Sequence, residues 1–123
     1  MSDQSHVPSQ ADERKALPLF SGVLAYFPDA LLAVADVSKK GNDQHNPGEP
    51  LHWAKEKSAD EADALVRHLL DHGTLDSDGV RHSAKVAWRA LALLQREIDK
   101  ERATRLPELI LSTYPPPRLL PSV

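Results

Sequence analysis

Residues 79–95, GVRHSAKVAWRALALLQ, place apolar and basic side chains on different sides of one predicted helix. Residues three and four positions apart lie on the same side of an α-helix, and both residue classes recur here at that spacing. The segment therefore predicts an amphipathic helix that packs its apolar side on another helix. Its basic side is either an anion-binding edge or simply the solvated face. The apolar positions are Val80, Ala84, Ala87, Trp88, Leu91, Leu94 and Ile98, and the basic ones are His82, Lys85, Arg89 and Arg96.

The composition limits the size and the class of the protein. A length of 123 residues with 41% hydrophobic residues suffices for one domain with one core. The net charge of -3 gives no overall attraction to nucleic acid, so we expect no DNA partner and only local anion binding. The absence of cysteine excludes disulfides, thiolate zinc sites and a cysteine nucleophile. The chain has no apolar run of membrane-spanning length and no signal peptide, so we expect a cytoplasmic protein without a membrane partner.

The predicted fold class is all-α: a small helical bundle built on an antiparallel helix hairpin, with a structured loop and a Pro-rich C-terminal extension. Residues 1–15 are polar and predict a flexible tail. Residues 16–105 form the predicted helical domain, in which residues 17–27 are expected to be an irregular cover. Residues 106–123 are the extension, which we expect to pack on the body or on a neighbouring subunit.

The first predicted helix begins at Pro28, because proline suits the first helical position. It is expected to run to about Lys40, with Gly41 after its C-terminus. The second helix is expected to begin at Ala59, to end near His72 and to bury Ala62, Leu65, Val66 and Leu69.

Ser58 and Glu61 have the spacing of a capping box at the start of this second helix. Gly73 is its predicted C-terminal cap. The acidic turn that follows, TLDSDG, is short enough to make the second and third helices antiparallel neighbours.

The segment between the first two helices, residues 42–57, is rich in amide and imidazole side chains. Long loops inside compact domains are usually functional or disordered, and Trp53 favours order. The segment can contact the base, sugar or phosphates of a nucleotide, although turn capping explains Asn42 and Asn46 equally well. The candidate binding residues are Asn42, Gln44, His45, Asn46, Trp53 and Lys57.

The two hairpin helices carry complementary chemistry. Asp60 and Asp63 are one turn apart and can share a hard divalent cation, and Asp76 or Asp78 of the acidic turn can add a further ligand. On the third helix, Lys85 and Arg89 suit phosphate oxygens. Three structural alternatives stay open: an ordinary Asp63–Arg67 helix pair, a core histidine at His68, and solvated acidic side chains at Asp71, Asp76 and Asp78.

Three segments in order, KKGNDQHNPGEPLHW, DALVRHLLDHG and DSDGVRHSAKVAWRALALLQ, resemble the small phage-encoded domains of the dATP/dGTP diphosphohydrolase N-terminal type. The resemblance covers residues 27–97 and implies an all-α, metal-dependent enzyme similar to the MazG-like pyrophosphohydrolases. Those enzymes cleave a nucleoside triphosphate to the monophosphate and pyrophosphate, whereas related proteins yield the diphosphate, so the cleaved bond stays open. The positions that match the recurring ones are Asp63, Arg67, His68, Asp78, His82 and Trp88.

Two departures from the family pattern bear on the site. Lys85 and Arg89 stand where many relatives have a histidine and an asparagine, which favours binding phosphate over binding metal. The EExxE carboxylate box of the MazG proteins is absent, so their two-metal catalysis is not transferred to this chain.

The resulting hypothesis is hydrolysis of a (deoxy)purine nucleoside triphosphate with Mg²⁺ or Mn²⁺, in the host cytoplasm if a phage encodes the protein. Its catalytic residues would be Asp63, His68 and His82, its metal ligands Asp60, Asp63 and Asp78, and its phosphate ligands Lys57, Arg67, Lys85 and Arg89. One alternative is a non-catalytic protein that sequesters a nucleotide or cyclic-nucleotide signal, for example a phage anti-defence protein. Another is a scaffold whose Pro-rich tail docks a partner. We also expect a homo-oligomer with composite sites.

Overall fold

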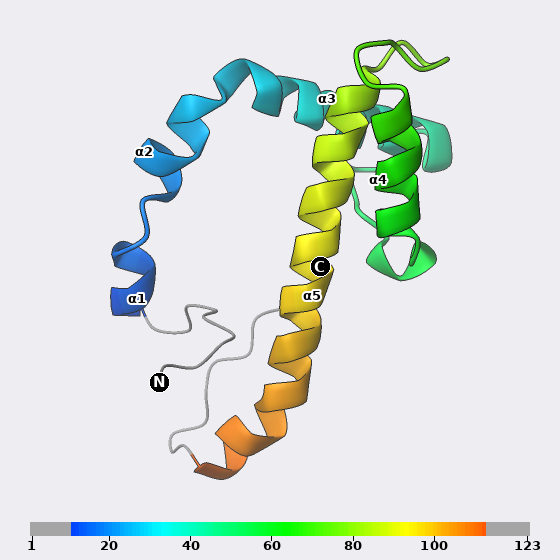
Figure 1. Ribbon diagram of the computed structural model, residues 1–123. Helices are drawn as coiled ribbons and strands as arrows, with labels where there is room; N and C mark the ends of the chain where they lie inside the picture. Colours follow the sequence, from blue (N-terminus) through cyan, green and yellow to red (C-terminus); the bar gives the residue numbers. More distant parts are fainter. Residues whose placement is uncertain (1–10, 113–123) are drawn as a thin grey trace.

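The computed structural model describes residues 11–112, and the side chains of Lys57 and of residues 106–112 lie outside the described part. Residues 11–112 contain helices, turns and one isolated bridge but no strand, so the all-α prediction is confirmed (Figure 1). The elements in chain order are α1 (Ala11–Lys15), α2 (Leu19–Gly22), η1 (Leu24–Tyr26), α3 (Pro28–His45), η2 (Lys55–Lys57), α4 (Glu61–Leu70) and α5 (His82–Ser112).

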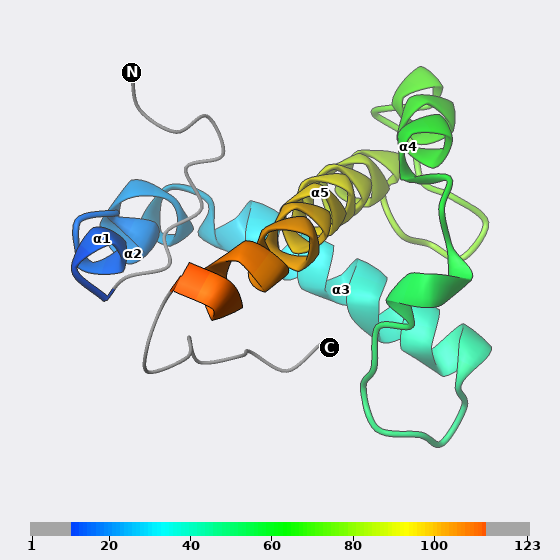
Figure 2. The ribbon, with the colours of Figure 1, turned by 90° about the horizontal axis from the view of Figure 1, so that it is seen from below.

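The long helix α5 is the axis of the structure. Helix α4 runs antiparallel to α5 beside the first half of α5, and α3 crosses α5 on another side (Figures 1 and 2). The predicted hairpin is therefore present. The short elements α1, α2 and η1 form an arm that reaches the rest of the protein through contacts between η1 and α3.

The turn between α4 and α5 is closed by backbone hydrogen bonds. The amide of Asp76 donates to Val80 O at 2.8 Å, and the amide of Gly79 donates back to Asp76 O at 2.9 Å. The amide of His82 donates to Thr74 O at 3.0 Å. Gly79 has φ +81°, a conformation that side chains with a Cβ rarely adopt. The turn therefore holds Asp76 and His82 in fixed positions.

The hydrophobic core is small. Among the described residues, the buried hydrophobic side chains are Ala64, Val80, Ala84 and Ala92, and their small size lets α4 and α5 approach closely. The apolar side predicted for the third helix is right for Ala84 of α5 and for Val80, which lies in the turn before α5, whereas Leu91 and Leu94 are exposed.

The predicted apolar side of α4 is wrong. Ala62, Val66 and Leu69 are exposed, and Leu65 is only half-buried. The side of α4 that faces α5 instead contains Glu61, Ala64 and His68, which recur at helical spacing. Two polar residues lie in this interface because α5 offers each of them a polar partner.

Helix α3 extends beyond its predicted end. It ends at His45 rather than Lys40, and Gly41 lies inside it without a positive φ. The helix continues because Asn42, in its last turn, is buried and bonded to the following loop.

The start of α4 also differs from its prediction. The helix begins at Glu61, and no side chain caps its first amides. The hydroxyl of Ser58 contacts the carboxylates of Asp60 and Glu61 at 2.9 and 3.4 Å, so the capping box does not form.

The two ends of the described part are helical. Residues 11–15 of the predicted flexible tail form α1, and α5 includes residues 106–112 of the predicted extension. The remaining residues of both segments, 1–10 and 113–123, lie outside the described part, including the Pro-rich run. Within residues 11–112 no single helix is long and apolar enough to span a membrane. The segments Leu19–Tyr26 and Pro28–His45, which meet at a bend, have that length and apolar composition only when taken together.

Candidate functional site

A pocket of about 560 Å³ lies between α3, the loop that follows it and the first turns of α5. Helix α4 contributes only His68 to its wall. Nine residues predicted from the sequence line this pocket: Asn42, Gln44, His45, Asn46, Trp53, His68, Asp78, Lys85 and Arg89. The other lining residues were not among the candidate binding residues from the sequence, and they include Lys40, His52, Ser58 and Trp88.

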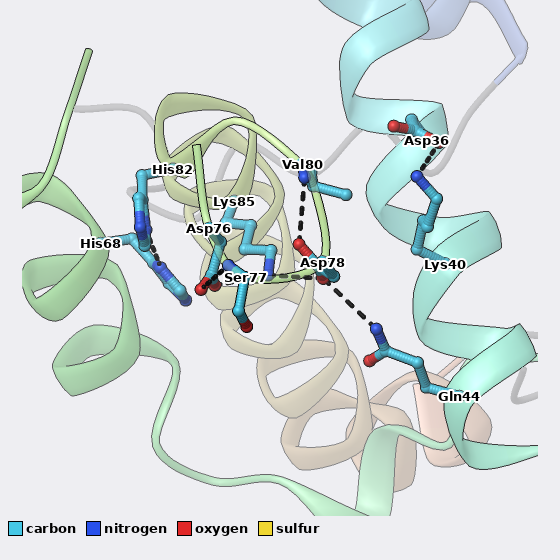
Figure 3. Close-up of polar contacts among 10 residues, drawn as sticks. All are labelled: Asp36, Lys40, Gln44, His68, Asp76, Ser77, Asp78, Val80, His82 and Lys85. Atoms are coloured by element: carbon cyan, nitrogen blue, oxygen red, sulfur yellow. Dashed lines mark hydrogen bonds and ion pairs between the residues drawn. The ribbon is translucent and has the colours of Figure 1, made fainter. Parts of the chain in front are cut away.

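At one end of the pocket, His68 of α4 meets His82 of α5. Their Nδ1 atoms are 2.9 Å apart, so one ring donates a hydrogen bond to the other in the absence of an ion (Figure 3). One ligand atom each from His68, His82 and Asp76 lies within 4.8 Å of the other two, and all three residues are half-buried. We refer to these three residues as the His–Asp–His cluster. Two imidazoles and a carboxylate form a donor set that fits a divalent cation.

Lys85 links the two carboxylates of the acidic turn. Its ammonium donates to Asp76 Oδ2 at 2.7 Å and to Asp78 Oδ2 at 2.9 Å (Figure 3). Burial lowers the pKa of Lys85, but the hydrogen bonds to the two carboxylates outweigh burial and raise it. The positive charge of Lys85 is therefore already compensated within the protein.

The same contacts fix the protonation of the neighbouring groups. The hydrogen bond from Lys85, followed by that from the amide of Ser77, lowers the pKa of Asp76 to about 2. Burial and the positive charge of Lys85 lower the pKa of His68 below its ordinary value. At neutral pH Asp76 is thus a carboxylate and His68 a neutral imidazole with one acceptor nitrogen.

Asp78 connects the turn to α3. Its carboxylate accepts hydrogen bonds from the amide of Val80 at 3.0 Å and from Gln44 Nε2 at 3.3 Å (Figure 3). The hydrogen bond from Lys85, then that from Val80, lowers the pKa of Asp78. Asp78 and Gln44 therefore join the two walls of the pocket.

At the other end of the α4–α5 interface, Glu61 is only 3% exposed. Its Oε1 accepts a hydrogen bond from Arg89 Nη1 at 2.7 Å, and its Oε2 lies 3.6 Å from Arg96 Nε. Arg89 also contacts Ser58 Oγ at 3.4 Å. Glu61 thereby positions Arg89 in the pocket wall.

A comparison with protein families matches residues 8–105 to the family described as dATP/dGTP diphosphohydrolase, N-terminal. The chain belongs to this family. The resemblance inferred from the sequence is confirmed, and the family's name indicates a hydrolase of the diphosphohydrolase type. No curated protein and no solved structure matches the chain.

In this diphosphohydrolase-family chain, the predicted metal ligands are not brought together. Among the described residues, the His–Asp–His cluster is the group of three potential ligands that the fold assembles, and it contains none of Asp60, Asp63 and Asp78. Asp60 instead accepts a hydrogen bond from Arg67 at 3.2 Å, and both side chains are more than half exposed. Hydrogen bonds from Ser58 and then Arg67 lower the pKa of Asp60.

The remaining predicted residues differ in their surroundings. Trp53 packs edge-on against Trp88 with ring centroids 5.7 Å apart, and Lys55 Nζ lies 5.1 Å from a Trp53 ring centroid. Asp63 and Arg67 are exposed and lie outside the pocket wall. The side chain of Lys57 lies outside the described part of the structure.

Asn42, predicted as a base or sugar ligand, organises the loop after α3. Its Nδ2 donates to Glu49 O at 3.1 Å, and its Oδ1 accepts from the amide of His52 at 3.2 Å. Asn46 Nδ2 makes a longer contact with the same oxygen, at 3.4 Å. The capping alternative left open by the sequence therefore describes Asn42 well, although its side chain also lines the pocket.

Replacing Asn42 by alanine is expected to lower the free energy of unfolding by about 1–3 kcal/mol, because part-buried backbone groups of Glu49 and His52 lose their partner. Urea denaturation measures the change in stability, and amide exchange at His52 measures the local loosening. Asn46→Ala is the control and is expected to change both much less. Unchanged exchange at His52 in Asn42→Ala would contradict the assigned role.

Sequence reasoning missed Glu61 as a site residue, and it did not place Asp76 beside the two histidines. A usable signal existed, because His68 and His82 are 14 residues apart and Glu61 and Arg89 are 28 apart. Both pairs are centred on Leu75, in the middle of the turn. In an antiparallel hairpin, residues at equal distances from the centre of the turn face each other, so these polar pairs were predictable once the hairpin was assumed.

Proposed function

We propose that the chain hydrolyses a phosphoric anhydride bond of a purine deoxynucleoside triphosphate with the help of a divalent cation, Mg²⁺ or Mn²⁺. The observation that supports this most directly is the position of His68, which belongs both to the pocket wall and to the His–Asp–His cluster. A nucleotide in the pocket would therefore have its phosphates beside a group of potential metal ligands. The family's name points to the same class of reaction.

The pocket offers cations for the phosphates and aromatic surface for the base. Lys40 and Arg89 line the pocket, and the ion pair of Lys40 with Asp36 is long, at 3.6 Å, with side chains that are 40% and 45% exposed. Such pairs contribute little energy, so Lys40 can exchange Asp36 for a phosphate at small cost. Trp53 and His52 also line the pocket and can contact the base. Lys85 is the weaker candidate for phosphate because two carboxylates compensate its charge.

In the proposed reaction, the oxygen of one water molecule forms a bond to phosphorus while a bond from that phosphorus to a bridging oxygen breaks. Attack at the α-phosphorus gives the monophosphate and pyrophosphate, and attack at the terminal phosphorus gives the diphosphate and phosphate. A bound divalent cation would supply the positive charge that favours ionised water and stabilises the developing charge on the phosphates. Arg89, held by Glu61, would bind phosphate oxygens in a fixed orientation.

The test is incubation of the purified protein with deoxynucleotides, ribonucleotides and cyclic nucleotides, each with Mg²⁺, with Mn²⁺ or with EDTA, followed by chromatography of the products. We expect cation-dependent conversion of a purine deoxynucleoside triphosphate, and the products identify the broken bond. Tight retention of an unchanged nucleotide would contradict hydrolysis and favour the sequestering alternative. If neither conversion nor binding occurs, the nucleotide proposal is wrong.

The same proposal includes a role in nucleotide-pool metabolism in the cytoplasm. If a phage encodes the protein, this is the cytoplasm of the host.

The exposed apolar surface supports the further part of the proposal, a homo-oligomer. Phe20 on the arm is 72% exposed, and Leu32 on α3 and Leu70 on α4 are 70% and 79% exposed. The largest fully buried side chain is only a valine, Val80, so the described core is small for an independent domain. We expect light scattering to give at least twice the chain mass of 13.6 kDa, and a monomer at micromolar concentration would contradict this. Phe20→Ser is expected to weaken the association, with exposed Ser21→Ala on the same arm as the control.

A further inference from the structure

The His–Asp–His cluster combines three different parts of the hairpin. His68 comes from α4, Asp76 from the turn and His82 from the first position of α5. The 2.9 Å between the two Nδ1 atoms agrees with ligation of a single ion, because two nitrogens bound at about 2.1 Å and at a right angle lie about 3.0 Å apart. We propose that these three residues bind one first-row transition-metal ion, such as Mn²⁺, Co²⁺ or Zn²⁺.

Of the two cations proposed for the reaction, the donor set favours Mn²⁺ over Mg²⁺. Imidazole nitrogen suits first-row transition ions, whereas Mg²⁺ prefers oxygen ligands and keeps much of its water. The pair Asp60 and Asp63, which would suit Mg²⁺, lies outside the cluster. Three protein ligands would also leave coordination positions for water or for a phosphate oxygen.

The surroundings of Asp76 prepare it as a ligand. Its Oδ1 accepts the amide of Ser77 at 2.7 Å and its Oδ2 accepts Lys85 at 2.7 Å, which fixes the orientation of the carboxylate. Each carboxylate oxygen can accept more than one contact, so both retain capacity for an ion. Asp76 and Asp78 carry two negative charges and Lys85 one positive charge, so this triad keeps a net negative charge beside the cluster.

The cluster also borders the pocket, because His68 lines it. An ion bound there would lie at the edge of the pocket, within reach of nucleotide phosphates. This catalytic use of the ion rests on the proposed function, whereas binding of the ion itself does not.

The experiment uses the full chain after removal of metals with a chelator. Calorimetric titrations with Mn²⁺, Co²⁺, Zn²⁺ and Mg²⁺ give the stoichiometry and the affinity, and visible absorption of bound Co²⁺ reports its ligands. The variants are His82→Gln and Asp76→Asn. The matched control is His72→Gln, because His72 is exposed and lies outside the cluster. Circular dichroism verifies that every variant is folded.

We expect one ion per chain, with tighter binding of Co²⁺ or Zn²⁺ than of Mg²⁺. His82→Gln and Asp76→Asn should each weaken binding by at least roughly tenfold, because even loss of a group that only orients a ligand costs about 10–100-fold. His72→Gln should bind like the wild type. If Asp76→Asn does not fold, His82→Gln alone decides the result. Glutamine is uncharged, so we expect the His82→Gln variant to fold.

Absence of saturable transition-metal binding, or unchanged binding in both variants, would overturn the metal site and leave a plain hydrogen bond between two histidines. Tighter binding of Mg²⁺ would overturn the assignment of the donor set. The proposed function fails separately, since metal binding without any nucleotide conversion would contradict hydrolysis and leave the site standing. Conversion that persists in EDTA would contradict the need for the ion.

Discussion

Replacing Glu61 by alanine is expected to lower the free energy of unfolding by about 2–3 kcal/mol. Removing one partner of a buried ion pair typically costs about 3–5 kcal/mol, because the other charge is left without compensation. We expect less here because the Arg89 and Arg96 side chains are 29% and 32% exposed and can be partly solvated. Thermal denaturation followed by circular dichroism should show a Tm lower by roughly 10 °C.

The control for this prediction is Glu97→Ala, because Glu97 is an exposed glutamate on α5. A surface substitution of this kind is expected to change stability by less than about 0.5 kcal/mol. A double-mutant cycle with Arg89→Met isolates the contribution of the Glu61–Arg89 pair. Equal effects of Glu61→Ala and Glu97→Ala would contradict the structural role of Glu61. All variants are compared at one protein concentration, because self-association would make Tm depend on it.

The fold could be predicted where the signal is local. The helical period of the segment that forms α5 and the short acidic turn before it are sufficient for an antiparallel hairpin, and the structure contains that hairpin. Pro28 correctly marks the start of α3. These features depend on neighbouring residues only, so no knowledge of tertiary contacts was needed.

The predictions failed where the partner of a residue lies far away in the sequence. The residues chosen for the buried side of α4, such as Val66 and Leu69, are the most apolar set, whereas the structure buries the side with Glu61 and His68. Burying a carboxylate is unfavourable unless a cation meets it, and Arg89 is 28 residues away. The end of α3 was misplaced for a similar reason, because the loop groups that Asn42 bonds come later in the chain.

The candidate site was predicted in part. Residues of the last turn of α3, of the loop after it and of the start of α5 do line one pocket, as their chemistry suggested. The choice between Asp76 and Asp78 as the residue beside the two histidines could not be made from the sequence. Two residues apart in a tight turn, their side chains point in directions set by the closure of the turn. In the structure Asp76 faces the histidines and Asp78 faces Gln44 of α3 (Figure 3).

The position of Asp76 beside the two histidines leads to the largest expected effect on activity. If the protein hydrolyses nucleotides as proposed, Asp76→Ala is expected to reduce kcat/KM by at least about 100-fold, because it removes a ligand of the His–Asp–His cluster. The double variant Asp60→Ala/Asp63→Ala is expected to stay within about threefold of the wild type. Asp60 makes only an exposed ion pair with Arg67, and neither aspartate lines the pocket.

Steady-state kinetics on the nucleotide identified in the panel, with saturating divalent cation, measures both effects. Asp71→Ala is the matched control, since Asp71 is an exposed aspartate next to the same turn and outside the cluster. The opposite outcome, loss of activity in Asp60→Ala/Asp63→Ala with normal activity in Asp76→Ala, would favour the helix-borne carboxylate pair over the cluster. Equal loss in both would mean that two separate groups of carboxylates take part, since no group of three potential ligands among the described residues contains Asp76 together with Asp60 or Asp63.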